Sequence, residues 1–150
     1  MERRGLTITA DTNVLVRALV ADEPAQAAEA SRVMRKAASI AIPLPVLCEL
    51  VWVLKRVYGF TKGDIASAIR SLLAASHVRL DRAAVEAGLA VLEAGGDFAD
   101  GVIAHQGQWL GGDTFVSFDR QAVTLLREQG VATQLLRSRH GEPAFFSGGE

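Results

Sequence analysis

The sequence has very little cysteine: Cys48 is the single one, and it lies inside an apolar run. One thiol can form neither an internal disulfide nor a thiolate-rich zinc site. The sequence therefore excludes a disulfide-stabilised secreted domain, and we expect a protein of the reducing cytoplasm.

Long hydrophobic runs are also missing. The basic N-terminus, MERRGLTITAD, continues as a short alternating stretch and lacks the apolar core of a signal peptide. The longest apolar run, residues 42–54, is interrupted by Glu49 and is too short to cross a bilayer. We expect a soluble protein without a membrane partner.

Net charge is nearly absent, because 16 basic residues offset 17 acidic ones to leave −1. Binding to nucleic acid must therefore depend on local separation of charge. A length of 150 residues with 49% hydrophobic content suits one domain. We expect this domain at residues 1–137, followed by a flexible tail at residues 138–150 that is rich in Gly, Ser and Pro.

Helical and strand patterns alternate along the chain. Parallel strands need a crossover connection, which helices supply, so the alternation predicts an α/β fold. We expect a three-layer α/β/α sandwich with a short central parallel sheet that contains all five strands. The predicted strands are residues 6–10, 39–42, 77–80, 114–118 and 131–136. The predicted helices are residues 13–21, a helix capped by Asp22 that reaches residue 38, residues 44–58, a helix capped by Thr61 that reaches residue 75, a helix capped by Asp81 that ends near Gly95, residues 97–110 and residues 121–129.

Asp11 and Asp119 each follow a predicted strand. Ligands of parallel α/β sheets bind beyond the carboxyl ends of the strands, so both carboxylates can reach one place. Either residue alone is equally well explained as a helix cap or a turn former. Together they predict an acidic pocket.

Glu49 is the more unusual acid. On a helix, the residues three and four positions from Glu49 are all apolar: Pro45, Val46, Trp52 and Val53. No Lys or Arg therefore lies at pairing distance. Burying an unpaired carboxylate costs several kcal/mol unless a partner or a metal neutralises it. Two alternatives remain open: the helix turns this face to solvent, or a distant arginine pairs with Glu49.

Asp97 and Asp100 stand three residues apart at a predicted helix start, where acids are more often caps than ligands. The rest of this helix is apolar, so Asp100 should lie beside the buried stripe. Converging carboxylates repel one another, and a divalent cation removes this penalty. Oxygen ligands favour Mg²⁺ or Mn²⁺ over zinc, and such ions serve phosphoryl chemistry.

Four segments carry a family resemblance: DTNVLVRAL at 11–19, LPVLCELVWVL at 44–54, DFADGVIA at 97–104 and SFDR at 117–120. In this order and spacing the chain resembles the PIN domain, and most closely the VapC toxins of type II toxin–antitoxin modules. The resemblance spans residues 6–136. One departure is Gly101, where such proteins commonly carry alanine, and we expect it to loosen the turn behind Asp100.

The resemblance implies an endoribonuclease toxin that binds Mg²⁺ or Mn²⁺. Water would attack an RNA phosphodiester and leave a 5′-phosphate and a 3′-hydroxyl. It also implies homodimers and inhibition by a cognate VapB-type antitoxin. The implied catalytic and metal-binding residues are Asp11, Glu49, Asp100 and Asp119, with support from Thr12, Asn13, Asp97 and Ser117.

RNA beside an acidic pocket needs cations around the rim, although surface cations commonly only face solvent. The candidates by position are Arg17, Lys55, Arg56 and Arg120. Trp52 and Trp109 fall in apolar helical segments, so we predict them in the core rather than as platforms for base stacking.

Two other protein classes each require a residue that this sequence lacks, and one binding function remains open. An aspartyl-nucleophile phosphatase needs a second Asp two residues after Asp11, and that position is Asn13. A receiver domain needs a late lysine, and none follows Lys62. A PIN-like module that binds RNA or a partner without cleavage remains the alternative.

Overall fold

The computed structural model describes residues 5–147, in which helices and strands alternate as predicted. The strands are β1 (Thr7–Thr9), β2 (Ser39–Ala41), β3 (Val78–Arg79), β4 (Thr114–Ser117) and β5 (Ala132–Leu135). The helices are α1 (Thr12–Val20), α2 (Pro24–Lys36), α3 (Leu44–Arg56), α4 (Lys62–Ala74), α5 (Arg82–Glu93), α6 (Phe98–Trp109) and α7 (Arg120–Glu128), with a 3₁₀-helix at Phe145–Ser147. Each predicted element is present, with bounds shifted by a few residues.

The predicted helix caps are confirmed at two helices and wrong at one. The Thr61 hydroxyl accepts a hydrogen bond from Asp64 N–H at 3.1 Å, and the Asp81 carboxylate accepts one from Ala84 N–H at 3.1 Å. The prediction of Asp22 as the cap of α2 is wrong, because Glu23 holds that position. Asp22 instead pairs with Arg17 at 3.2 Å and accepts a hydrogen bond from the Tyr58 hydroxyl.

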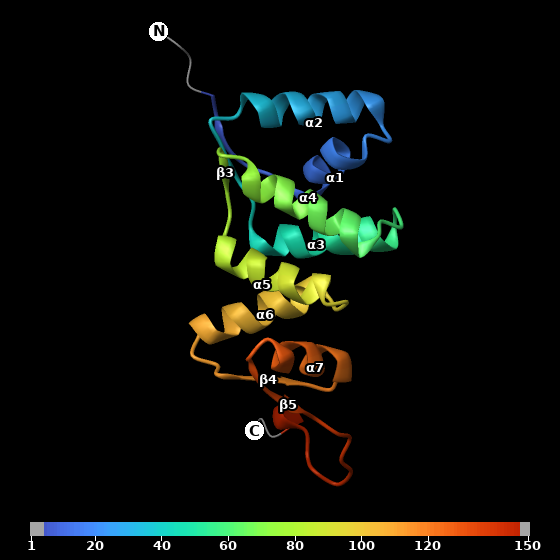
Figure 1. The fold of residues 1–150 in the computed structure, drawn as a ribbon, viewed down its shortest axis with the longest axis vertical. Coiled ribbons are helices and arrows are strands. Elements are labelled where there is room, and N and C mark those ends of the chain that lie inside the picture. The colour runs from blue at the N-terminus through green and yellow to red at the C-terminus, as the bar shows by residue number, and fades with distance from the viewer. Residues whose placement is uncertain (1–4, 148–150) are drawn as a thin grey trace.

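The strand pairs of residues 5–147 are all parallel, which confirms an α/β fold with a short parallel sheet. The prediction that five strands share one sheet is wrong. Strands β1, β2 and β3 form one sheet in that order, and β4 pairs with β5 in a second. Strands β1 and β4 are therefore both edge strands. Figure 1 shows α5 and α6 between the part of the molecule that holds β3 and the part that holds β4 and β5.

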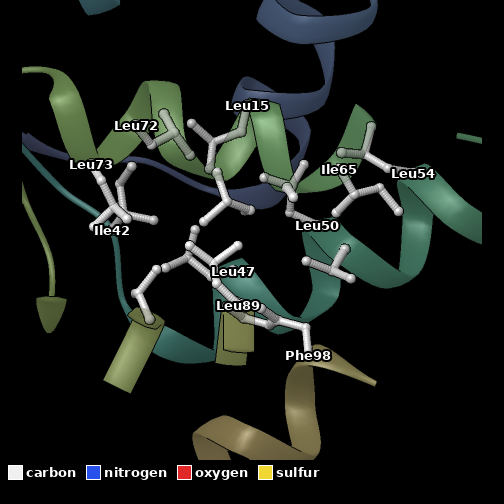
Figure 2. Packing of buried hydrophobic residues seen from close by; sticks show 14 of the residues in the cluster. Leu15, Ile42, Leu47, Leu50, Leu54, Ile65, Leu72, Leu73, Leu89 and Phe98 are labelled. Carbon is white, nitrogen blue, oxygen red and sulfur yellow. The ribbon is translucent and has the colours of Figure 1, made fainter. Parts of the chain in front are cut away.

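The main hydrophobic core lies where α1, α3, α4, α5 and α6 meet (Figure 2). Leu15, Leu50, Ile65 and Phe98 are among its fully buried side chains. A smaller cluster joins α5, α6 and α7, and its buried members are Val91, Ala104 and Leu126. The second cluster attaches the β4–α7–β5 segment, which we call the C-terminal unit, to the α5–α6 pair.

Two glycines let α5 and α6 approach closely. A Cβ atom on Gly101 would lie 2.3 Å from the carbonyl oxygen of Ala87, and one on Gly88 would lie 2.7 Å from the Phe98 ring. Real Cβ atoms do not approach other atoms this closely, so these positions need glycine. The departure at Gly101 therefore tightens a helix contact rather than loosening a turn.

Neither chain end bears out or contradicts its prediction. Residues 1–4, which belong to the region examined for a signal peptide, and residues 148–150 of the predicted flexible tail lie outside the described residues. Phe145 and Phe146 are exposed. The division into a domain at 1–137 and a tail stays a prediction. Within residues 5–147, no helix has both the length and the apolar character needed to span a membrane.

Replacing Gly101 with alanine should push α5 away from α6. We expect the free energy of unfolding to fall by about 1–2 kcal/mol, because overpacking outweighs the better helix propensity of alanine. Urea denaturation followed by circular dichroism measures the change.

Gly107→Ala is the matched control in the same helix, because a Cβ atom there meets nothing within 4 Å. This variant should be unchanged or more stable by up to about 1 kcal/mol. Equal effects of the two substitutions would contradict the close contact at Gly101.

Candidate acidic site

Three of the predicted site acids cap helices. Asp11 follows β1 and accepts a hydrogen bond from Thr12 N–H at 2.8 Å, and Asp119 follows β4 and accepts one from Ala122 N–H at 3.1 Å. Asp97 precedes α6 and accepts a longer bond from Ala99 N–H at 3.4 Å. In each case the bond uses Oδ1, so the capping role accounts for one carboxylate oxygen. All three side chains are exposed to solvent.

Asp100 differs from these three because it is not a cap. It lies in the first turn of α6 and is half-buried, and its carboxylate has no hydrogen bond or ion pair within residues 5–147. Burial, followed by the charges of Asp97 and Asp119, raises the pKa of Asp100 from 3.8 to about 6. Asp97, Asp100 and Asp119 thus interact electrostatically, and we call them the α6–α7 acid cluster.

Glu49 is exposed, so the prediction of a buried, unpaired carboxylate is wrong. Helix α3 buries its opposite face through Leu47, Leu50, Val51 and Leu54, and this turns Glu49 to solvent, as one of the open alternatives held. The neighbouring Cys48 lies close enough to Asp97 to sense its charge. Burial, followed by the charge of Asp97, raises the pKa of the Cys48 thiol. The helix that carries Glu49 therefore passes close to the start of α6.

Asp11 is separated from the α6–α7 acid cluster. It follows the three-stranded sheet, whereas Asp119 follows β4 in the other sheet, beyond α5 and α6 (Figure 1). Neither Asp11 nor Glu49 is among the charges that raise the pKa of Asp100. In the part of the chain that the structure describes, no three His, Cys, Asp or Glu side chains are arranged to hold a metal ion. A single chain in this arrangement therefore does not fit the predicted metal site.

The site acids are also not neutralised by basic side chains. The ion pairs within residues 5–147 join other acids: Asp22, Glu29, Glu93 and Glu86. An acid paired with arginine would have a structural explanation, and none of the four predicted catalytic residues has one of this kind.

The residues predicted to support the site have varied surroundings. Thr12 is buried behind Asp11, whereas Asn13 is exposed. The Ser117 hydroxyl accepts a hydrogen bond from Asp119 N–H at 2.9 Å, which stabilises the turn between β4 and α7. Their contribution to a reaction stays a prediction.

Lys55, Arg56 and Arg120 are exposed, and Arg17 is half-buried beside Asp22, so their contact with RNA stays a prediction. The prediction that both tryptophans belong to the core is wrong. Trp52 is 58% exposed and Trp109 is 78% exposed. Helical apolar patterns report which residues are hydrophobic, but not which face another element covers.

Sequence reasoning also missed two exposed apolar residues near Asp119. Val116 is 49% exposed and Phe118 is 68% exposed. Both belong to a strand pattern that was assigned to a central sheet, where both faces are normally covered. The alternating exposure along β4 and β5 shows that one face of the two-stranded sheet is uncovered within residues 5–147, and Val116 points to this face.

The fold and its acids define a class: small α/β proteins with parallel strands and carboxylates after the strand ends. The model of the PIN domain matches residues 8–125, so the chain belongs to the PIN domain family. No curated protein matches the chain. PIN domains are typically nucleases that use divalent metal ions. The match therefore supports hydrolase activity in general and a nucleic-acid substrate.

Asp100→Asn should stabilise the metal-free protein at neutral pH. Folding raises the pKa of Asp100 from 3.8 to about 6, so the native state binds more protons than the unfolded chain within this interval. Wild-type stability should therefore fall as the pH rises from about 4 to about 7. We expect the variant to be more stable by about 1 kcal/mol at pH 7, a value reduced for solvent screening, with little difference near pH 4.

Urea denaturation in EDTA at both pH values measures this difference. Asp113→Asn removes an exposed charge before β4 and serves as the control. A variant that is less stable than wild type at pH 7 would contradict the electrostatic strain within the acid cluster.

Proposed function

We propose that this chain is a Mg²⁺- or Mn²⁺-dependent endoribonuclease and the toxin component of a VapBC-type module. The observation that carries the proposal is the α6–α7 acid cluster, in which a half-buried Asp100 with a raised pKa has no cation beside it within residues 5–147. The family match supports a nuclease-type fold around these acids.

The proposal assigns the catalytic and metal-binding roles to Asp11, Glu49, Asp100 and Asp119. The carboxylates of Asp97 and Asp119 stand at helix N-termini, where the helix dipole and the capping bonds stabilise their negative charge. Asp100 lacks such bonds and would gain most from a positive neighbour. Because one chain does not bring Asp11 to the cluster, the active site requires a further change of arrangement.

The acidic cluster repels RNA phosphates, so binding needs cations nearby. Arg120 directly follows Asp119, and Lys55 and Arg56 end the helix that carries Glu49. These exposed side chains, with Arg17, are proposed to contact the RNA backbone. A homodimer in the cytoplasm, inhibited by a VapB-type antitoxin, completes the proposal, and residues 138–150 are proposed as a tail outside the domain.

A second candidate is a PIN-like module that binds RNA or a partner without cleavage. The capping bonds of Asp11, Asp97 and Asp119 favour it, because they explain three acids without catalysis. Asp100 has no such explanation, and it therefore distinguishes the two candidates.

Purified wild-type protein should cleave mixed cellular RNA in the presence of Mg²⁺ or Mn²⁺ and leave 5′-phosphate and 3′-hydroxyl ends. Asp100→Asn and Asp119→Asn should each lower the rate by about 100-fold or more, a loss typical of a group that acts directly on the reaction. Asparagine caps helices as well as aspartate, so Asp119→Asn removes charge while it keeps the cap. Gel electrophoresis and end-labelling measure the products.

Glu86→Gln is the control, because Glu86 is exposed on α5 and makes only a weak pair with Arg82 at 3.9 Å. This variant should keep wild-type activity. Cleavage that persists in EDTA and in both aspartate variants would contradict the metal-dependent mechanism. RNA binding without cleavage in every sample would establish the binding module instead.

Induced expression in bacteria should slow growth for wild type and not for Asp100→Asn, since the toxin role depends on RNA cleavage. Sequencing of 5′-phosphorylated RNA ends shortly after induction would then identify the RNA that is cut. Equal growth inhibition by both proteins would contradict a toxin that acts through this site.

A further inference from the structure

Within residues 5–147 the two sheets leave four edge strands without a further neighbour, and two of these, β1 and β4, are each followed by a site acid. Strand β1 is an edge of the three-stranded sheet, and β4 is an edge of the two-stranded sheet. Asp11 lies two residues beyond Thr9, and Asp119 lies two residues beyond Ser117. Unpaired edges are templates for another strand.

The backbone directions of the two edges are complementary. Ala10 N–H donates to Ala41 O at 3.0 Å. The backbone N–H and C=O groups of the even residues of β1 therefore point toward β2, and those of Thr9 point to the open edge. Leu136 N–H donates to Ser117 O at 2.8 Å. The backbone groups of Ser117 therefore point toward β5, whereas those of Val116 point to the open edge. In a parallel pair of strands, the backbone of one residue forms hydrogen bonds with the two residues that flank its partner on the other strand. Thr9 opposite Ser117 satisfies this rule on both strands.

The side chains agree with the same register. Ile8 comes opposite Val116, and Ala10 opposite Phe118, so these four side chains point to one face. A hollow of about 650 Å³ lies on the Ile8 side of β1; its lining residues are Gly5, Leu6, Ile8, Arg32, Val33, Lys36 and Ala37. Val116 and Phe118 are apolar and exposed in the single chain. Pairing of β4 with β1 would bring Val116 beside Ile8 at this hollow and place Phe118 opposite the buried Ala10, which would remove apolar surface from water.

The register also reunites the acids. With Thr9 opposite Ser117, Asp11 comes opposite Asp119, because each lies two residues further along its strand direction. Parallel strands end at the same edge of a sheet, so Asp11 would join the α6–α7 acid cluster. The set that a single chain leaves divided would then be assembled.

The C-terminal unit is held away from β1 of its own chain. Val91 of α5 and Leu126 of α7 are buried against each other's elements, and Gln121 Nε2 donates to Gly95 O at 3.3 Å. The Gly88 and Gly101 contact holds α5 against α6. Pairing within one chain would break these buried contacts, whereas a second copy brings its C-terminal unit intact.

We propose that two copies exchange their C-terminal units, with β4 of each chain paired to β1 of the other in the Thr9–Ser117 register. The contact is reciprocal and closes as a two-fold dimer. Each reactive site then combines Asp11 of one chain with Asp100 and Asp119 of the other. The catalytic meaning of this arrangement rests on the proposed function, but the strand pairing does not.

Cross-linking between unlike chains tests the pairing itself. In a Cys48→Ala background, a Thr9→Cys chain with one affinity tag is co-expressed with a Ser117→Cys chain that carries another. Oxidation or a short bis-thiol reagent should join the two chains. Thr9→Cys with Ser71→Cys, on the exposed side of α4, is the control and should give no product. The absence of a Thr9–Ser117 product overturns the exchange.

The double variant Thr9→Cys/Ser117→Cys separates exchange from closure within one chain. Exchange predicts covalent dimers on denaturing gels. A cross-linked monomer, with Thr9 and Ser117 joined in the same chain, overturns the proposal and supports closure instead.

Complementation tests whether the site is shared. Asp11→Asn and Asp119→Asn chains with different tags are co-expressed, and mixed dimers are isolated by two successive affinity steps. One site of each mixed dimer carries both substitutions and the other carries none, so activity should be about half that of wild type. Each variant alone should be inactive. Inactive mixed dimers beside an active wild type overturn the shared site.

Failure of the proposed function gives a different pattern. An inactive wild type that still forms the Thr9–Ser117 cross-link contradicts the ribonuclease and leaves the exchange in place. An active wild type without cross-link and without complementation contradicts the exchange alone.

Discussion

The close packing of α5 against α6 decides the arrangement of the rest of this molecule. Gly88 and Gly101 have no Cβ atom to separate the two helices, and Phe98 packs into the contact. Helix α7 then packs on the far side of this pair through Leu126. As a consequence, β4 lies away from β1, and the parallel strands divide into two sheets whose edges stay open.

This division sets the character of the acidic site. Asp11, Asp97 and Asp119 each stabilise a helix start, so they are useful to the fold in any arrangement. Asp100 is different, since it is half-buried among like charges and its pKa is raised to about 6. An electrostatic cost of this kind is typical of a functional site rather than of a structural one. It is consistent with the nuclease-type fold of the PIN domain family.

In the proposed exchanged dimer, the same interaction that stabilises the fold also controls its chemistry. A rigid α5–α6 pair prevents β4 from reaching β1 of its own chain, and so it makes the reactive site depend on association. The exposed Val116 and Phe118 supply the apolar contact, and the parallel register supplies the alignment of Asp11 with Asp119. Association and assembly of the acids would thus be one event.

Sequence alone determined the elements and much of their chemistry, because capping, turns and hydrophobic periodicity act over a few residues. The Thr61 cap, the alternation of helices and strands, and the acids after β1 and β4 were all readable. Tertiary structure decided which strands pair, that Glu49 faces solvent and that Trp52 is exposed. These features depend on contacts between residues distant in sequence: a helix pattern names an apolar face, whereas only packing selects what covers it.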